Sequence, residues 1–177
     1  MNRRQLEHVI RASADLAGDD EIVVVGSQSI LGRYPDAPAS LLVSMEADVY
    51  PRTHVERWNL IDGSIGEGSP FHQTFGYYAQ GVGPETATLP AGWETRLVAI
   101  RNENTRGATG LALDPHDLVL AKCVAARPKD GVFVREAIHA GLVERGRLLA
   151  LLEALPVEAA RRAEIRAALE ADFAGAT

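Results

Sequence analysis

The segment EIVVVG at residues 21–26 places the strongest constraint on the fold of this chain. It is a short, continuous apolar run that is rich in β-branched residues and bounded by the turn signals GDD and GS. Such a run is typical of a strand covered on both faces, because a strand with one solvated face alternates apolar and polar residues. The sequence therefore predicts a sheet with this strand at its centre.

The hydrophobic periodicity changes near residue 114. Before it, we expect a helix at residues 4–16, a short helix that Gly32 ends, and a helix at residues 55–66 that Gly63 and Gly66 break. Further strands are expected within residues 44–51, 75–79, 96–100 and 109–113. After it, helices are expected at residues 117–127, 129–141 and 145–155 and beyond Pro156. We therefore predict an α+β fold, with an α/β core at residues 1–114 and a C-terminal helical portion at residues 115–177 packed on the core.

Composition narrows the classes of partner. A formal net charge of −6 argues against a broad nucleic-acid-binding surface, so any RNA contact must be local. The single cysteine, Cys123, excludes an internal disulfide and a thiolate zinc cluster. This cysteine usage fits a reducing compartment, so we expect a cytoplasmic location. Because no run of about 18 apolar residues occurs, we expect no membrane partner.

A possible phosphate-binding turn follows the central strand in the segment GSQSILG. A strand that passes directly into a helix leaves backbone N–H groups and the positive end of the helix dipole pointing outward, which suits an anion. Gly26 would let a ligand approach the backbone, and the Ser27 hydroxyl would add a hydrogen bond. The alternative is that Ser27 is a simple helix N-cap.

Two carboxylates share one face of the next strand, SMEADVYP at residues 44–51. Successive side chains on a strand point to opposite faces, so Glu46 and Asp48 lie on the same face. Two like charges at that separation are unfavourable unless a cation lies between them. Mg²⁺ prefers carboxylate oxygens and is usually completed by water and substrate phosphates. The alternative is that both acids only face solvent.

The combination of a strand ending in Gly-Ser, a short helix and an acid–apolar–acid strand resembles the polymerase-β-like nucleotidyltransferase superfamily, particularly its toxin-associated, abortive-infection branch. This resemblance implies a mixed sheet flanked by helices. It also implies that Glu46 and Asp48 bind Mg²⁺, which holds a nucleoside triphosphate and activates an acceptor hydroxyl. The superfamily more often has aspartate at the position of Glu46.

A second motif, LDPHDLVLAKCVAARPKD, ends at residue 130. Lys122 is a lone charge on an apolar helix, so its ammonium either extends to water or reaches phosphate oxygens. Pro128 is predicted to end this helix near Arg127 and to begin the next one, in which Asp130 would stabilise the N-terminus. The motif resembles that of nucleotidyltransferase-type toxins. The resemblance implies functional roles for Lys122 and Asp130, with Arg127 and Lys129 as accompanying basic residues.

Together these resemblances imply Mg²⁺-dependent transfer of a nucleoside monophosphate from a nucleoside triphosphate to an acceptor hydroxyl. They suggest a toxin that acts on tRNA or protein and is restrained by an antitoxin, and a small-molecule acceptor is the alternative. The third carboxylate that the superfamily commonly uses is missing from the strands expected at residues 75–79 and 96–100. The alternative is therefore a catalytically inactive module of the same fold that binds a nucleotide or a partner. His72, Tyr77 and Tyr78 either contact a base or ribose or pack in the core.

Overall fold

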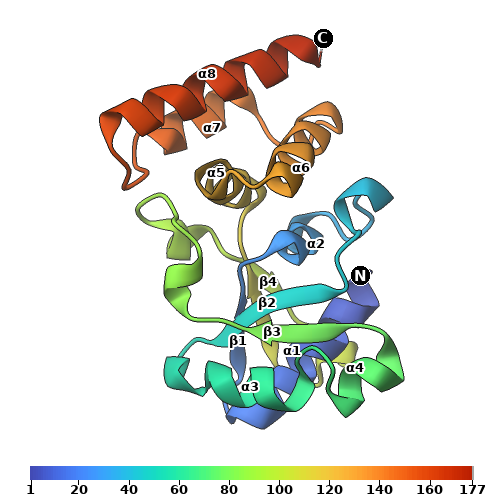
Figure 1. Ribbon diagram of the computed structural model, residues 1–177. Helices are drawn as coiled ribbons and strands as arrows, with labels where there is room; N and C mark the ends of the chain where they lie inside the picture. The colour runs from blue at the N-terminus through green and yellow to red at the C-terminus, as the bar shows by residue number, and fades with distance from the viewer. Residues whose placement is uncertain (177) are drawn as a thin grey trace. The chain divides into compact units, whose positions relative to one another are not determined.

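A computed structural model describes residues 1–176, with mixed helices and strands followed by helices alone (Figure 1). The helices are Arg3–Ala17 (α1), Ile30–Arg33 (α2), Trp58–Ile65 (α3), Pro70–Phe75 (α4), Pro115–Ala125 (α5), Pro128–His139 (α6), Arg145–Leu152 (α7) and Ala159–Gly175 (α8). The strands are Glu21–Val24 (β1), Glu46–Pro51 (β2), Tyr78–Gly81 (β3), Val98–Ile100 (β4) and Thr109–Ala112 (β5). The predicted α+β class is confirmed.

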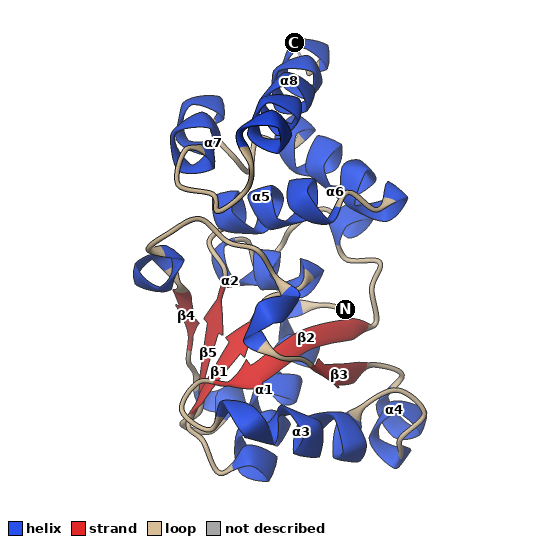
Figure 2. Ribbon diagram, turned by 60° about the vertical axis from the view of Figure 1, so that its left-hand side comes forward, coloured by secondary structure: helices blue, strands red, loops and turns tan. Residues whose placement is uncertain are grey.

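The five strands form one mixed sheet in the order β3-β2-β1-β5-β4, with β1 at its centre (Figure 2). β1 pairs antiparallel with β2 and parallel with β5, β2 pairs parallel with β3, and β4 pairs antiparallel with β5. Each side chain from Ile22 to Val25 is at most 5% exposed. The prediction of a central strand covered on both faces is therefore confirmed.

The strand register decides which face of β2 carries the acids. Val49 pairs with Gly81, and a Cβ atom at Gly81 would stand 2.1 Å from the Trp58 carbonyl oxygen of α3. Val49 therefore faces α3. Figure 2 shows α1 and α3 on the same side of the sheet. Because side chains alternate, Glu46 and Asp48 lie on the opposite face.

Gly32 and Gly63 were expected to interrupt helices, but both lie inside them. Gly32 lies inside α2, where a Cβ atom would stand 2.6 Å from the Ala112 Cβ, so its small size serves packing against β5. Gly63 lies inside α3 with no atom near its missing side chain, and only Gly66 ends that helix. Burial of Ile61 and Ile65 outweighs the cost of about 1 kcal/mol that an interior glycine carries.

The boundaries around two other helices also differ from the predictions. Residue 75 belongs to α4, which Ser69 caps by accepting a hydrogen bond from the His72 N–H, so β3 begins only at Tyr78. Helix α5 ends at Ala125, because Ala126 adopts a left-handed conformation with φ of 52°. Pro128 occupies the first turn of α6, as predicted.

The chain divides into two compact units, the first comprising Met1–Thr86 and Leu97–Asp114 and the second Ala87–Arg96 and the residues from Pro115 onward. In the second unit, Arg96 donates two hydrogen bonds of 2.8 Å to the fully buried Asp117 carboxylate. The Ala91 N–H also donates to the Ala154 carbonyl oxygen. These contacts hold the segment at residues 87–96 to α5 and to the turn after α7.

None of the helices within residues 1–176 has both the length and the apolar character that crossing a membrane requires.

Candidate functional site

The Asp48 carboxylate lies directly against Gly26 in the turn after β1. A Cβ atom at Gly26 would stand 1.8 Å from Asp48 Oδ2 and 2.6 Å from its Cγ. The Val25 N–H donates to the Asp48 carbonyl oxygen over 3.0 Å, which ties the turn to β2. Gly26 has a φ of −81°, which any residue adopts, so this position requires glycine for space. The acid-bearing strand and the Gly-Ser turn therefore converge.

Ser27 opens a short 3₁₀ turn, Ser27–Ser29, that leads into α2. Gly26 is the capping residue of this turn, and its carbonyl oxygen accepts from the Ser29 N–H over 2.9 Å. The Ser27 hydroxyl makes no hydrogen bond within the described residues. The interpretation of Ser27 as a side-chain N-cap is therefore wrong, and its hydroxyl is available to a ligand.

Glu46 is half-buried and pairs in register with Tyr78 on β3. The Tyr78 hydroxyl donates a hydrogen bond to Glu46 Oε2 over 3.1 Å. Burial and then the negative charge of Glu46 raise the pKa of Tyr78 to about 12, so the hydroxyl keeps its proton at neutral pH. The residue paired with Asp48 is Gln80, whose amide donates to the Asp62 carboxylate over 2.7 Å.

The carboxylate pair fits one class of metal ion. Glu46 and Asp48 offer hard oxygen donors on one face of β2. No cluster of three or more histidine, cysteine, aspartate or glutamate side chains in residues 1–176 is arranged to hold a metal. The pair therefore fits Mg²⁺, which keeps water ligands and takes further oxygens from a substrate, and does not fit a four-ligand structural zinc site.

Strand β3 carries tyrosine and glutamine at the two positions paired with the acids, and no carboxylate. The contact between Tyr78 and Glu46 was missed from the sequence, since only the strand register reveals it. The His72 ring packs against Tyr78 at a tilt of 48° with centroids 4.6 Å apart, and His72 Nδ1 accepts from the Gly68 N–H over 3.0 Å. Tyr77 instead contacts His8, with 2.8 Å between its hydroxyl and His8 Nδ1.

The second group of predicted residues centres on Asp130, whose side chain is fully buried. Lys122 Nζ donates to Asp130 Oδ1 over 3.0 Å, and Arg127 Nε donates to Oδ2 over 2.6 Å. Burial alone would raise the pKa of Asp130, but the hydrogen bonds from Arg127 and Lys122 outweigh it and lower that pKa. Lys122 is only 8% exposed and lies 4.5 Å from the centre of the Phe133 ring. The interpretation that Lys122 extends into water is therefore wrong.

The backbone between α5 and α6 creates this arrangement. Ala126 turns the chain in a left-handed conformation, and Arg127 is extended with φ of −71° and ψ of 153°. Pro128 then starts α6, so Asp130 in its first turn comes back to face Lys122 on α5. Lys129 is exposed in the same turn.

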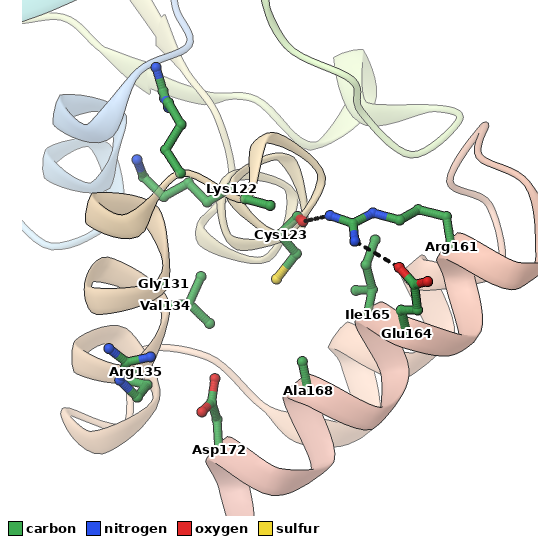
Figure 3. Close-up of a pocket in the computed structure, with 12 residues that line it drawn as sticks. Lys122, Cys123, Gly131, Val134, Arg135, Arg161, Glu164, Ile165, Ala168 and Asp172 are labelled. Carbon is green, nitrogen blue, oxygen red and sulfur yellow. Dashed lines mark hydrogen bonds and ion pairs between the residues drawn. The ribbon is translucent and has the colours of Figure 1, made fainter.

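A pocket of about 300 Å³ borders this group between α5, α6 and α8 (Figure 3). Its charged lining residues are Lys122, Arg127, Arg135, Arg161, Glu164 and Asp172. Arg161 donates to the Cys123 carbonyl oxygen and to Glu164 Oε2, each over 2.9 Å. Burial and then the charge of Asp172 raise the pKa of Cys123 to about 12, so its thiol remains protonated. The excess of cationic side chains favours an anionic group in the pocket.

The structure thus brings the predicted site residues together in two groups. Gly26, Ser27, Glu46 and Asp48 belong to the first unit. The Lys122–Asp130 pair belongs to the second unit, with Arg127 and Lys129.

A comparison with protein-family models matches residues 4–170 of this chain to the family described as "Nucleotidyltransferase of unknown function (DUF6036)". A search of curated proteins and a search of solved structures each return no match.

Proposed function

Because this chain belongs to the nucleotidyltransferase family DUF6036, we propose that it transfers a nucleoside monophosphate from a nucleoside triphosphate to an acceptor hydroxyl and releases pyrophosphate. The observation that supports this reaction best is the contact of the Asp48 carboxylate with Gly26. It puts a carboxylate oxygen beside the backbone of the Gly-Ser turn, which is the combination that an Mg²⁺–triphosphate requires.

In this proposal Glu46 and Asp48 hold Mg²⁺. The ion supplies charge neutralisation at the phosphoryl oxygens. The backbone at Gly26 and the Ser27 hydroxyl bind phosphate oxygens, for which the Ser27 hydroxyl is available as a donor. Asp48 thereby fixes the triphosphate relative to the turn, so that binding energy is used for orientation of the reacting phosphate.

Within the second unit, we assign Lys122 to the binding of a phosphate group. One N–H donor of its ammonium is used by Asp130, which fixes the direction of the side chain, and further donors serve phosphate oxygens. Arg127, which is 60% exposed, and Lys129 in the same turn add positive charge. Asp130 is then a positioning residue that acts through Lys122 and Arg127.

The proposed setting is that of a toxin that modifies tRNA or protein and is held inactive by an antitoxin. Support comes from the likeness of the Lys122–Asp130 motif to toxin-type nucleotidyltransferases. Expression of the wild-type chain should arrest bacterial growth, and the Asp48→Asn variant should not. Equal growth arrest by the wild type and by Asp48→Asn would contradict this setting.

Transfer is tested by incubating the protein with Mg²⁺, cell extract and each of the four triphosphates labelled at the α-phosphate. RNA, protein and small molecules are then separated, and the fraction that gains label identifies the acceptor class. We expect label transfer by the wild type and none by Asp48→Asn, because asparagine keeps the shape of aspartate and loses its charge.

The matched control is Asp36→Asn, which changes an exposed aspartate in the loop between α2 and β2. This variant should retain full transfer, and all three proteins should have the same melting temperature. Transfer by Asp48→Asn at the wild-type rate would refute the assignment of the metal ligands.

The second candidate function is a nucleotide-binding module without turnover. The observation that favours it is that Tyr78 and Gln80 occupy the positions paired with the two acids, where no third carboxylate stands. Calorimetry distinguishes the two functions. A module would bind Mg²⁺ and triphosphate with measurable heat and release no pyrophosphate with any acceptor fraction.

A further inference from the structure

A chain of contacts runs from the start of α4 through Tyr78 on β3 to Glu46, the predicted metal ligand on β2. The Gly68 N–H donates to His72 Nδ1 over 3.0 Å, the His72 ring lies 4.6 Å from the Tyr78 ring, and the Tyr78 hydroxyl donates to Glu46 Oε2 over 3.1 Å. Tyr78 is 7% exposed, so its ring is almost fully packed. These contacts join the start of α4 to the acid on β2.

The hydrogen bond restricts Glu46 more than packing alone would. A free glutamate side chain has three rotatable bonds, and holding it in one geometry costs entropy when a ligand binds. A carboxylate that already accepts a hydrogen bond from a buried hydroxyl has lost that freedom before the ligand arrives. The residues that orient metal ligands through hydrogen bonds typically change metal affinity by about 10-fold to 100-fold when they are replaced.

The length of the Glu46 side chain allows its carboxylate to accept this hydrogen bond from Tyr78. Glu46 reaches the hydroxyl of a residue directly paired with it on the neighbouring strand. An aspartate at position 46 would hold its carboxylate one methylene closer to the backbone of β2. The hydrogen bond to Tyr78 would then be lost unless the strands moved.

We propose that Tyr78 is a positioning residue for divalent-metal binding, which orients the Glu46 carboxylate from the paired position on β3, with His72 supporting its ring. This inference rests on the proposed function, since it takes Glu46 as a metal ligand. The centre then binds its ion through two carboxylates that are fixed in advance. Free metal alone binds weakly there, and the triphosphate completes the coordination.

The test is direct titration with Mn²⁺, followed by electron paramagnetic resonance of the unbound ion. This measurement does not depend on turnover or on knowing the acceptor. Tyr78→Phe keeps the ring and removes only the hydroxyl, and we expect its Mn²⁺ affinity to fall at least about tenfold. The control is Tyr77→Phe at the adjacent residue, whose hydroxyl contacts His8 and not Glu46, and it should stay within about twofold of the wild type.

Two further comparisons separate orientation from general damage. His72→Ala should weaken Mn²⁺ binding less than Tyr78→Phe does, and His72→Phe should restore it because a ring again packs on Tyr78. If Tyr78 acts through Glu46, Glu46→Asp should weaken binding, and adding Tyr78→Phe to it should cause no further loss. Raising the metal concentration should recover the kcat of Tyr78→Phe for label transfer, whereas a damaged fold would not recover.

The outcomes also distinguish this inference from the function on which it rests. Wild-type Mn²⁺ binding that Asp48→Asn abolishes and Tyr78→Phe leaves unchanged would overturn the role of Tyr78 and leave the metal site standing. No Mn²⁺ binding by the wild type, together with no rise in its melting temperature when Mn²⁺ and triphosphate are both added, would overturn both. If the double variant Glu46→Asp/Tyr78→Phe loses as much Mn²⁺ binding free energy as the two single variants together, Tyr78 does not act through Glu46.

Discussion

The Lys122 ammonium donates a hydrogen bond to the Asp130 carboxylate over 3.0 Å, and the two side chains are 8% and 0% exposed. A buried ion pair of this kind has a specific energetic character. Removal of both charges is often tolerated, whereas removal of one leaves the other charge buried without its partner. The pair is therefore a sensitive position in the helical unit for both stability and the proposed chemistry.

We predict that Asp130→Ala lowers the free energy of unfolding by about 3–5 kcal/mol, because Lys122 remains buried without its carboxylate. Arg127→Ala should cost less than about 1 kcal/mol, since that side chain is 60% exposed. The double variant Lys122→Met/Asp130→Leu should be more stable than Asp130→Ala. Urea unfolding measures all three, and a double variant less stable than Asp130→Ala would contradict the burial argument.

The stability of the protein should decrease in two steps on acidification. Burial, then Arg11 and Arg106, lowers the pKa of His8, so the unfolded chain takes up a proton first as pH falls below about 6.5. Hydrogen bonds lower the pKa of Glu7 and Asp130 against the opposing effect of burial. Their stabilisation is present above the unfolded pKa values and is lost as pH falls below about 4.

Urea unfolding at a series of pH values from 8 to 3 measures these steps. His8→Phe should remove the step near pH 6.5, because phenylalanine does not titrate and suits the surrounding aromatic side chains. Glu7→Gln should reduce the slope below about pH 4. A stability that rises as pH falls from 7 to 4 would contradict the sign of the His8 shift, and one that rises between pH 4 and 3 would contradict the signs of the Glu7 and Asp130 shifts.

Gly26→Ala should abolish nucleotide transfer and lower stability, because its Cβ would overlap the Asp48 carboxylate at 1.8 Å. The carboxylate or the turn must move, and either movement separates the proposed metal ligand from the phosphate-binding backbone. Gly63→Ala in α3 is the matched control, since no atom lies within 4 Å of its missing side chain. It should keep full activity and raise stability by about 0.5–1 kcal/mol.

Ala126→Gly should raise the free energy of unfolding by about 0.5–1 kcal/mol, because glycine adopts a φ of 52° without the steric penalty that alanine carries. Ala125→Gly, one residue earlier and helical, should lower it by up to about 1 kcal/mol. Thermal unfolding of the two variants compares them directly. A destabilising Ala126→Gly change would show that the alanine side chain contributes packing that outweighs its strain.

Cys123 should react slowly with a thiol-specific disulfide reagent at pH 8. Its pKa is raised to about 12 by burial and by Asp172, so little thiolate is present. The single cysteine makes the readout unambiguous. The reaction should accelerate by at least about a hundredfold in denaturant, where an ordinary cysteine pKa near 8.5 is restored. Equal rates in the native and unfolded protein would contradict burial of the thiol.

Local sequence patterns determined the parts of this protein that depend on near neighbours. The β-branched run at residues 21–26 specifies a central strand because only a strand covered on both faces accommodates it. The alternation in β2 specifies that Glu46 and Asp48 share a face, and Pro128 specifies the start of α6. Each of these depends on chain geometry within a few residues.

Only the tertiary structure decided which distant residues meet. The Tyr78 hydroxyl contacts Glu46, 32 residues away, because β2 and β3 pair in one register. No local sequence pattern fixes that register. The Asp48 carboxylate lies on Gly26, and Gly32 and Gly63 stay helical, because packing between elements outweighs local preference. The sequence therefore determined which side chains carry the chemistry, and long-range packing determined their geometry.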